Sequence, residues 1–179
     1  TDHDAHERDE REVAAEEALL DGAELRLVGL DVDVHVVELS DLVAVTVDDA
    51  YVAGPNAVKR TLTTPVLGTG NFVKNGAGYL ILNPTLAAGQ VSYSGTTFVN
   101  NGWLEMNALS TNGAAVINSF NGNAAHLVLN ATNDVTYSGL VSGTGELVIQ
   151  ASAGKTLTAG GSLTHTGGTN VLTGTLLAQ

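Results

Sequence analysis

The chain has 179 residues, of which 44% are hydrophobic, so it is long and apolar enough to bury the core of one domain. Its net charge of −12 argues against nucleic-acid and anionic-membrane partners, and its lack of cysteine excludes disulfides and cysteine-ligated zinc. No run of 18 apolar residues occurs, so we expect no membrane insertion by this chain.

The charge is concentrated in the first third of the chain. Residues 1–60 hold 16 of the 19 acidic and 5 of the 7 basic side chains, a balance of −11, whereas residues 61–179 hold three acids and two bases, a balance of −1. Glycine shows the opposite distribution, with three residues before position 60 and eighteen after it. The composition therefore predicts an acidic N-terminal extension over residues 1–60 and a separate repeat domain over residues 61–179.

The acidic extension is expected to open as a charged arm and to continue as strands. Residues 13–20 are rich in Ala, Glu and Leu, which favour about two turns of helix with a narrow apolar face. From Leu25 to Val47, apolar residues alternate with polar ones, and many of the apolar residues are β-branched. This alternation predicts two or three strands with one solvated face, which act as a cap or as an assembly segment.

Beyond residue 60, short apolar segments recur between glycine and asparagine residues. The segments are 79–82, 91–93, 97–99, 103–106, 115–117, 127–129, 135–137, 147–149, 156–158, 170–172 and 175–177. Strands this short, with turns this close, are typical of a solenoid in which each strand stacks on the strand one coil earlier. We therefore predict an all-β fold, a right-handed parallel β-helix that carries an acidic, β-rich N-terminal extension.

The interior of this predicted solenoid follows from the same apolar pattern. Its core residues are expected to be Leu80, Leu82, Val91, Val99, Leu104, Val116, Leu127, Leu129, Val135, Leu147, Ile149, Leu157, Val171 and Leu176. Ser and Thr occupy many of the alternate positions and predict a polar outer surface.

Two blocks of sequence occur twice. The block Gly68–Phe72 (GTGNF) returns later in the chain as Gly143–Leu147 (GTGEL). The block Tyr93–Thr97 (YSGTT) returns, after a similar interval, as His165–Thr169 (HTGGT). Two aligned blocks with similar offsets indicate stacked coils.

A longer pattern of glycine, lysine and apolar residues runs through the first copy of these blocks. Its positions are Gly68, Gly70, Lys74, Gly76, Gly78, Leu80, Leu82, Gly95, Thr97, Val99, Gly102 and Leu104. A second copy retains Gly143, Gly145, Leu147, Leu157, Gly167, Thr169, Val171, Gly174 and Leu176 but lacks the Lys-x-Gly-x-Gly centre. The pattern resembles the passenger-associated repeat of bacterial autotransporters over about residues 66–178. The resemblance implies a β-helix scaffold outside a bacterial cell, without catalytic residues.

Two groups of residues are candidates for metal binding. The N-terminal Thr1–His3 offers the four nitrogens of a square-planar Cu(II) or Ni(II) site, and His6 adds a zinc ligand. Four aspartates are calcium candidates, although their spacing matches neither an EF-hand loop nor a glycine-rich nonapeptide. They are Asp31, Asp33, Asp48 and Asp49. We expect these side chains to be solvated and predict no metal or cofactor site.

The repeat domain contains few residues suited to catalysis or sugar binding. The titratable candidates are His126, His165, Asp134, Glu105 and Glu146, and the aromatic candidates are Trp103, Tyr79, Tyr93 and Phe98. The two glutamates would form a carboxylate pair only if the register of the coils brought them together. The aromatic residues form a sugar-stacking platform in one interpretation; in the other, which we favour, they stack inside a coil or cap it. We predict no catalytic site.

Three functions are compatible with these features. We expect a structural or adhesive protein, secreted or exposed on a bacterial surface, that contacts a protein or glycan there. In the first alternative, copies stack head to tail into a filament or surface layer, and the segment Leu25–Val47 of one copy covers the end Asn170–Leu177 of the next. Within a single copy, the same segment would instead cap its own solenoid near residues 61–67. The second alternative is a glycan-active enzyme on a β-helix scaffold.

Overall fold

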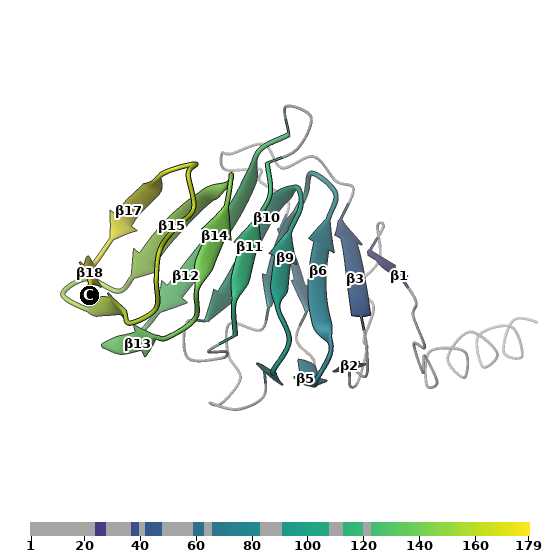
Figure 1. The fold of residues 1–179 in the computed structure, drawn as a ribbon, viewed down its shortest axis with the longest axis horizontal. Helices are drawn as coiled ribbons and strands as arrows, with labels where there is room; N and C mark the ends of the chain where they lie inside the picture. Colours follow the sequence, from purple (N-terminus) through teal and green to yellow (C-terminus); the bar gives the residue numbers. More distant parts are fainter. Residues whose placement is uncertain are drawn as a thin grey trace, which may run out of the picture.

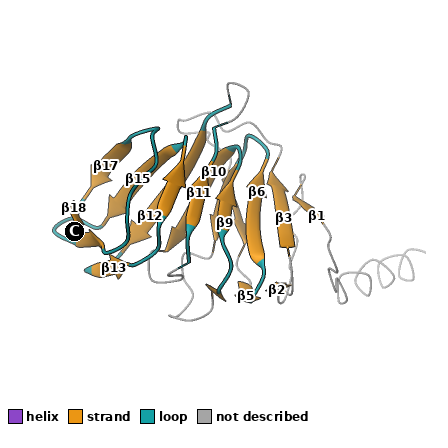
Figure 2. Ribbon diagram, in the orientation of Figure 1, coloured by secondary structure: helices purple, strands orange, loops and turns teal. Residues whose placement is uncertain are grey.

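The computed structural model describes residues 24–27, 37–39, 42–47, 59–62, 66–82, 91–107, 113–119 and 123–179. This part of the chain consists of strands and turns and contains no helix (Figure 2). Accordingly, no helix among these residues is long and apolar enough to cross a membrane. The helical turns predicted over residues 13–20 lie outside the described residues.

The strands form three faces that wind around a common interior (Figure 1). The first sheet has the order β1 (Glu24–Leu27), β3 (Leu42–Val47), β6 (Asn71–Asn75), β9 (Thr97–Val99), β11 (Ala115–Ile117) and β14 (Val141–Gly143). The second sheet has the order β4 (Lys59–Leu62), β7 (Tyr79–Leu82), β10 (Gly102–Asn107), β12 (Ala125–Ala131), β15 (Glu146–Ala151) and β17 (Thr169–Thr173). The third face has two short sheets, one of β2 (Val37–Leu39), β5 (Val66–Gly68) and β8 (Val91–Tyr93), the other of β13 (Val135–Tyr137), β16 (Thr156–Ala159) and β18 (Thr175–Ala178).

The described strands follow one another in the order third face, first sheet, second sheet, as in β5–β6–β7 and β13–β14–β15, and every described strand pair is parallel. Phe72 pairs with Thr97, Thr97 with Ala115 and Ala115 with Val141, so successive turns differ in length. The prediction of an all-β parallel solenoid is therefore confirmed, with about 4 turns. All eleven strand segments predicted beyond residue 60 lie in observed strands.

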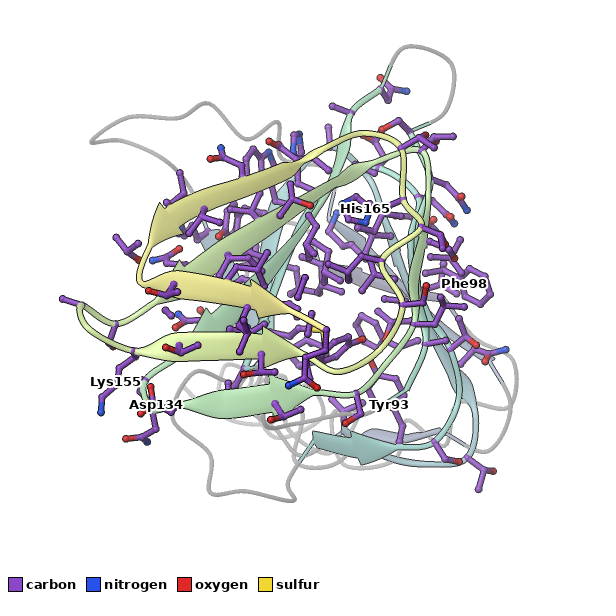
Figure 3. The ribbon with its side chains drawn as sticks, turned by 60° about the vertical axis from the view of Figure 1, so that its left-hand side comes forward. Tyr93, Phe98, Asp134, Lys155 and His165 are labelled. Carbon is purple, nitrogen blue, oxygen red and sulfur yellow. The ribbon has the colours of Figure 1, made fainter. Side chains whose placement is uncertain are left out.

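The side chains that point inward fill the coil with a continuous apolar core (Figure 3). Ten predicted core residues are buried: Leu80, Leu82, Val99, Leu104, Leu127, Leu129, Val135, Leu147, Ile149 and Leu157. Leu176 is partly buried against them, and the side chain of Val91 lies outside the described part.

Two predicted core positions are wrong. In β11 the buried residues are Ala115 and Ile117, so Val116 faces outward and the predicted register is off by one. Val171 has the register of a core residue, because it pairs with the buried Ile149, yet 43% of its surface is exposed. No described strand stacks on the outer edge of β17, and the side chain therefore stays uncovered.

The strands of the acidic extension belong to the same sheets as the repeat domain. Three strands lie in the segment for which two or three were predicted. β1 stacks on β3, β3 on β6 and β2 on β5, all in parallel. In this structure the segment thus covers its own solenoid, as the capping alternative predicted.

The repeated sequence blocks are one corner motif placed at two different corners. Gly68 pairs with Tyr93 where the third face meets the first sheet, whereas Gly143 ends a strand of the first sheet where the chain turns into the second. The backbone bonds match: Ser94 N donates to Gly68 O, and Thr166 N donates to Gly143 O, at 3.0 and 2.9 Å. The stretch of chain between the two copies therefore makes several complete turns and then crosses one further face of the coil.

Glycine also forms a ladder along one corner of the solenoid. The sheet register aligns five residues, each one turn after the previous one: Gly70, Gly95, Gly113, Gly139 and Gly161. A Cβ atom at Gly95 would overlap the carbonyl of Gly70, and a Cβ atom at Gly139 would overlap the carbonyl of Gly113. Only glycine allows the backbones of successive turns to stack this closely.

Candidate functional site on the outer face of the second sheet

A column of aromatic and charged side chains runs along the outer face of the second sheet. The strand register places one residue from each of five neighbouring strands in line: Lys59, Tyr79, Trp103, His126 and Glu146. The alternation of each strand turns these residues outward, while the residues that follow them, such as Leu80 and Leu104, point into the core. We call this set the outer column.

The rings of the outer column stack on one another from turn to turn. The Tyr79 and Trp103 rings are 5.7 Å apart at an angle of 9°, and the Trp103 and His126 rings are 3.8 Å apart at 11°. Neighbouring rings thus cover the indole on both sides. A sugar ring needs an open aromatic face, which this indole does not offer. The rings stack on the outer face of the sheet, whereas the favoured interpretation placed them inside a coil or at its cap.

The other two aromatic candidates lie elsewhere. Tyr93 is buried in the interior, and Phe98 projects from the outer face of the first sheet (Figure 3). The four residues proposed for a sugar-stacking platform therefore do not gather on one surface.

Glu105 lies beside the outer column and is held by three partners. The Tyr79 hydroxyl donates a hydrogen bond of 2.6 Å to Glu105 Oε2, and Asn130 Nδ2 donates one of 2.9 Å to Oε1. Lys59 Nζ lies 3.5 Å from the same carboxylate and 4.0 Å from the centre of the Tyr79 ring. These bonds compensate the desolvation of a carboxylate that is only 6% exposed.

The proposed pair of catalytic carboxylates is not formed. Glu146 Oε2 lies 2.7 Å from His126 Nδ1, at the far end of the outer column from Lys59. Glu105 and Glu146 lie on β10 and β15, which are separated by β12, and Glu105 is in register with Val148 rather than with Glu146. Their backbones are therefore more than two strand spacings, or more than roughly 9.6 Å, apart. Each carboxylate is bound to a different partner.

Apolar side chains share this outer face with the charged groups. Tyr79, Val128 and Val148 form a small buried cluster, and Ile81 and Trp103 pack against it. The outer face of the second sheet is therefore a mixed surface, on which apolar side chains lie beside the charged groups of the outer column.

Lys74 is a charged residue inside the solenoid. Its side chain is fully buried, and Nζ donates to the carbonyl oxygens of Asn75 (2.7 Å), Gly76 (2.7 Å) and Asn101 (3.1 Å). The ammonium thus binds the carbonyls of two successive turns at one corner. Lys74 belongs to the pattern that resembles the passenger-associated repeat, and its role in this chain is to hold that corner.

Two phenols are buried in the interior. Burial raises the pKa of Tyr137 to about 12, and its hydroxyl donates a 2.8 Å hydrogen bond to the carbonyl of Gly113. Burial also raises the pKa of Tyr93, whose hydroxyl shares a hydrogen bond with Thr97. His165 and Thr169 form the equivalent bond of the second corner motif, at 2.8 Å.

The remaining titratable candidates do not join the outer column. Asp134 accepts a 2.7 Å hydrogen bond from Thr156 N and lies 3.9 Å from Lys155 Nζ, at the edge of the third face (Figure 3). His165 is in the last turn, and its Nδ1 is the one buried side-chain polar atom without a partner among the described residues. The sequence thus identified the titratable residues, but it did not reveal which ones share a face.

No group of three or more His, Asp or Glu side chains that could hold a metal ion occurs in the part of the chain that the structure describes. The candidates Thr1–His3 and His6 lie outside that part. So do the four aspartates considered for calcium, Asp31, Asp33, Asp48 and Asp49.

The chain was also compared with known proteins. No family model, no curated protein and no solved structure matches it. The architecture and the side-chain contacts described above are therefore the basis for a functional assignment.

Proposed function

We propose that this chain is a non-enzymatic, extracellular β-solenoid with a structural or adhesive role, similar to the passenger of a bacterial autotransporter. The observation that carries the proposal is the corner chemistry of Lys74 and the stacked glycines. Two residues of the repeat pattern, Gly95 and Lys74, occupy positions where a coil needs a small residue or a carbonyl-binding cation. The pattern thus has a physical basis in a solenoid of this kind.

The polar side chains on the surface support a scaffold rather than a reaction centre. Glu105 is bound to Tyr79 and Asn130, Glu146 to His126, and Asp134 to the backbone of Thr156. Groups that bind each other within the chain hold neighbouring turns together. We therefore assign them a stabilising role and regard the outer faces as surfaces that contact a protein or a glycan.

The location is tested by protease treatment of intact cells that express the full gene. The proposal predicts that an antibody against the described solenoid loses its signal when intact cells are treated. Digestion only after lysis would contradict an extracellular location.

The adhesive role is tested by binding of the purified chain to glycan arrays and to cell-surface protein. Ser142→Arg and Gln150→Arg form a matched pair, because both residues are partly exposed at outward positions, on the first and the second sheet respectively. Loss of binding in only one variant would identify the contact face. Absence of binding to every glycan and protein surface would contradict adhesion and leave a purely structural role.

A filament subunit is a second candidate, because the last turn leaves apolar side chains exposed. Val171, Leu172 and Leu177 are 43%, 57% and 50% exposed. Apolar residues at an open strand edge favour contact with another strand.

A further inference from the structure

The outer face of the first sheet, which is turned toward the viewer in Figure 1, contains an aromatic ring that no other ring covers. Phe98 lies on β9, in register with Val73 of β6 and Val116 of β11, and its outward side chain is partly exposed. Figure 3 shows the side chain projecting from the solenoid. No described residue makes a ring contact with Phe98, whereas both sides of the Trp103 indole on the second sheet are covered. The two sheets therefore differ in what their aromatic residues leave open.

Polar side chains flank the Phe98 ring along the direction of the strand. Thr96 precedes Phe98 by two residues and Asn100 follows it by two, so the alternation turns both outward, each roughly 6.6 Å along the strand from Phe98. Asn100 Nδ2 donates a 3.0 Å hydrogen bond to Asn75 Oδ1, and Asn118 Nδ2 donates one of 3.4 Å to Asn100 Oδ1. We call Asn75, Asn100 and Asn118 the asparagine ladder. It forms a polar row from turn to turn beside the ring.

These polar groups keep hydrogen-bonding capacity that the described part of the chain does not use. No described residue binds Asn75 Nδ2 or Asn118 Oδ1, at the two ends of the asparagine ladder. The Thr96 hydroxyl also has no partner among the described residues. An amide nitrogen is a donor, an amide oxygen is an acceptor and a hydroxyl is both. The surface beside Phe98 therefore offers both donors and acceptors to a ligand.

The surface around Phe98 is neutral and only modestly apolar. No outward position of β6, β9 or β11 holds a charged residue. Val73, the nearest aliphatic neighbour on β6, is only 9% exposed, so little apolar surface is available beyond the ring itself. A protein interface needs a larger apolar core, whereas a small polar ligand needs one apolar contact and a few well-placed hydrogen-bonding groups. The face therefore suits a neutral, hydroxyl-rich ligand better than a protein.

We propose that the outer face of the first sheet binds a neutral glycan, with one sugar ring stacked on Phe98 and its hydroxyl groups hydrogen-bonded to Thr96 and the asparagine ladder. A sugar ring has apolar C–H groups on its faces and hydroxyl groups around its edge, so it matches an open aromatic ring flanked by amides. The net charge of −12 disfavours anionic glycans. The inference rests on the adhesive role proposed above and gives that role a contact face and a ligand class.

The ring is tested by isothermal titration of the full chain with three neutral polysaccharides, dextran, laminarin and galactomannan, and with the anionic polymer alginate. The wild type should bind at least one neutral polymer. Phe98→Leu keeps an apolar side chain but removes the ring, so it should weaken that binding about fivefold. Phe98→Tyr keeps the ring and should bind within about twofold of the wild type.

The polar row is tested by a pair of matched variants. Thr96→Val removes one hydroxyl and keeps the shape of the side chain, so it should weaken binding about threefold. Thr158→Val makes the same change at an outward, partly exposed position of β16 on the third face and should leave binding unchanged. The melting temperature of each variant shows whether the fold is intact, and Thr96→Val tests the face even where a change at Phe98 unfolds it.

Three results would overturn the inference. The first is binding of a neutral polymer that neither Phe98→Leu nor Thr96→Val weakens, and the second is stronger binding of alginate than of any neutral polymer. The third is a chain that binds no neutral glycan but still binds cell-surface protein, which would leave the adhesive role intact. Absence of binding to glycans and proteins alike would contradict both the inference and the adhesive role.

Discussion

The last two turns of the described solenoid place similar residues in the same columns, with different outcomes. Ile149 and Val171 are paired in register, yet Ile149 is fully buried and Val171 is 43% exposed. Leu157 and Leu176 form a second such pair, one buried and one partly covered. The difference is the presence of a following turn. In a solenoid, therefore, burial belongs to the interface between turns rather than to the residue type.

The largest effect is expected where a covered core position receives a charge. Leu80 is fully buried in β7, so Leu80→Asp should cost at least about 3 kcal/mol of unfolding free energy because it buries an unpaired carboxylate. Leu140 is 43% exposed, and the control Leu140→Asp should change stability by less than about 0.5 kcal/mol. Urea denaturation measures both. Equal costs for the two variants would show that the assigned inward register is wrong.

A smaller effect compares the covered and the open turn directly. Ile149→Ala should cost about 3 kcal/mol because it leaves a cavity between the turns that contain β12 and β17. Val171→Ala, in the same column, should cost less than about 0.5 kcal/mol in the monomer. A cost of more than about 1.5 kcal/mol for Val171→Ala at low concentration would mean that something already covers the last turn.

These columns also show what could be predicted from the sequence. Short strands separated by glycine and asparagine were sufficient for the solenoid, because such spacing suits few other folds. Val116 was assigned to the wrong face because Ala115, Val116 and Ile117 are all apolar, so the segment has no alternation to fix its register.

The outer column could not be predicted from the periodicity of the sequence. Its residues Tyr79, Trp103, His126 and Glu146 are unevenly spaced along the chain, because turns differ in length. No single repeat length aligns them. Gly68 and Gly143 illustrate the same limit, since an identical motif marks two different corners. The local sequence encodes the geometry of a corner, whereas the lengths of the intervening turns decide which corner it forms.

Buried tyrosine side chains should make the stability of the solenoid fall at high pH. The raised pKa of Tyr137, about 12 against about 10 in the unfolded chain, means that the unfolded state loses its proton first. Stability is therefore complete below about pH 10 and should fall by up to about 2 kcal/mol between about pH 10 and 12. Tyr93 contributes in the same direction. Tyr137→Phe should be less stable at pH 8 but lose less stability on raising the pH; an unchanged slope would indicate an exposed phenol.

The smallest effect concerns the outer face. His126 stacks on Trp103, the single tryptophan of the chain, so His126→Ala should cost about 1 kcal/mol and increase acrylamide quenching of the indole fluorescence. The control His165→Ala lies in the last turn and should leave the quenching unchanged. Equal quenching in the wild type and the His126 variant would contradict the stacked column.

The most direct test of the contrast between covered and open turns is hydrogen exchange of individual backbone amides in the monomeric chain. Residues 125–131 of β12 lie between two paired strands, so their amides should exchange only on global unfolding. In β18, the amide of Leu177 should be protected, whereas those of Leu176 and Ala178, which face the open edge, should exchange rapidly. Fast exchange throughout β12, or equal protection of all three β18 amides in the monomer, would contradict a parallel solenoid with an open last turn.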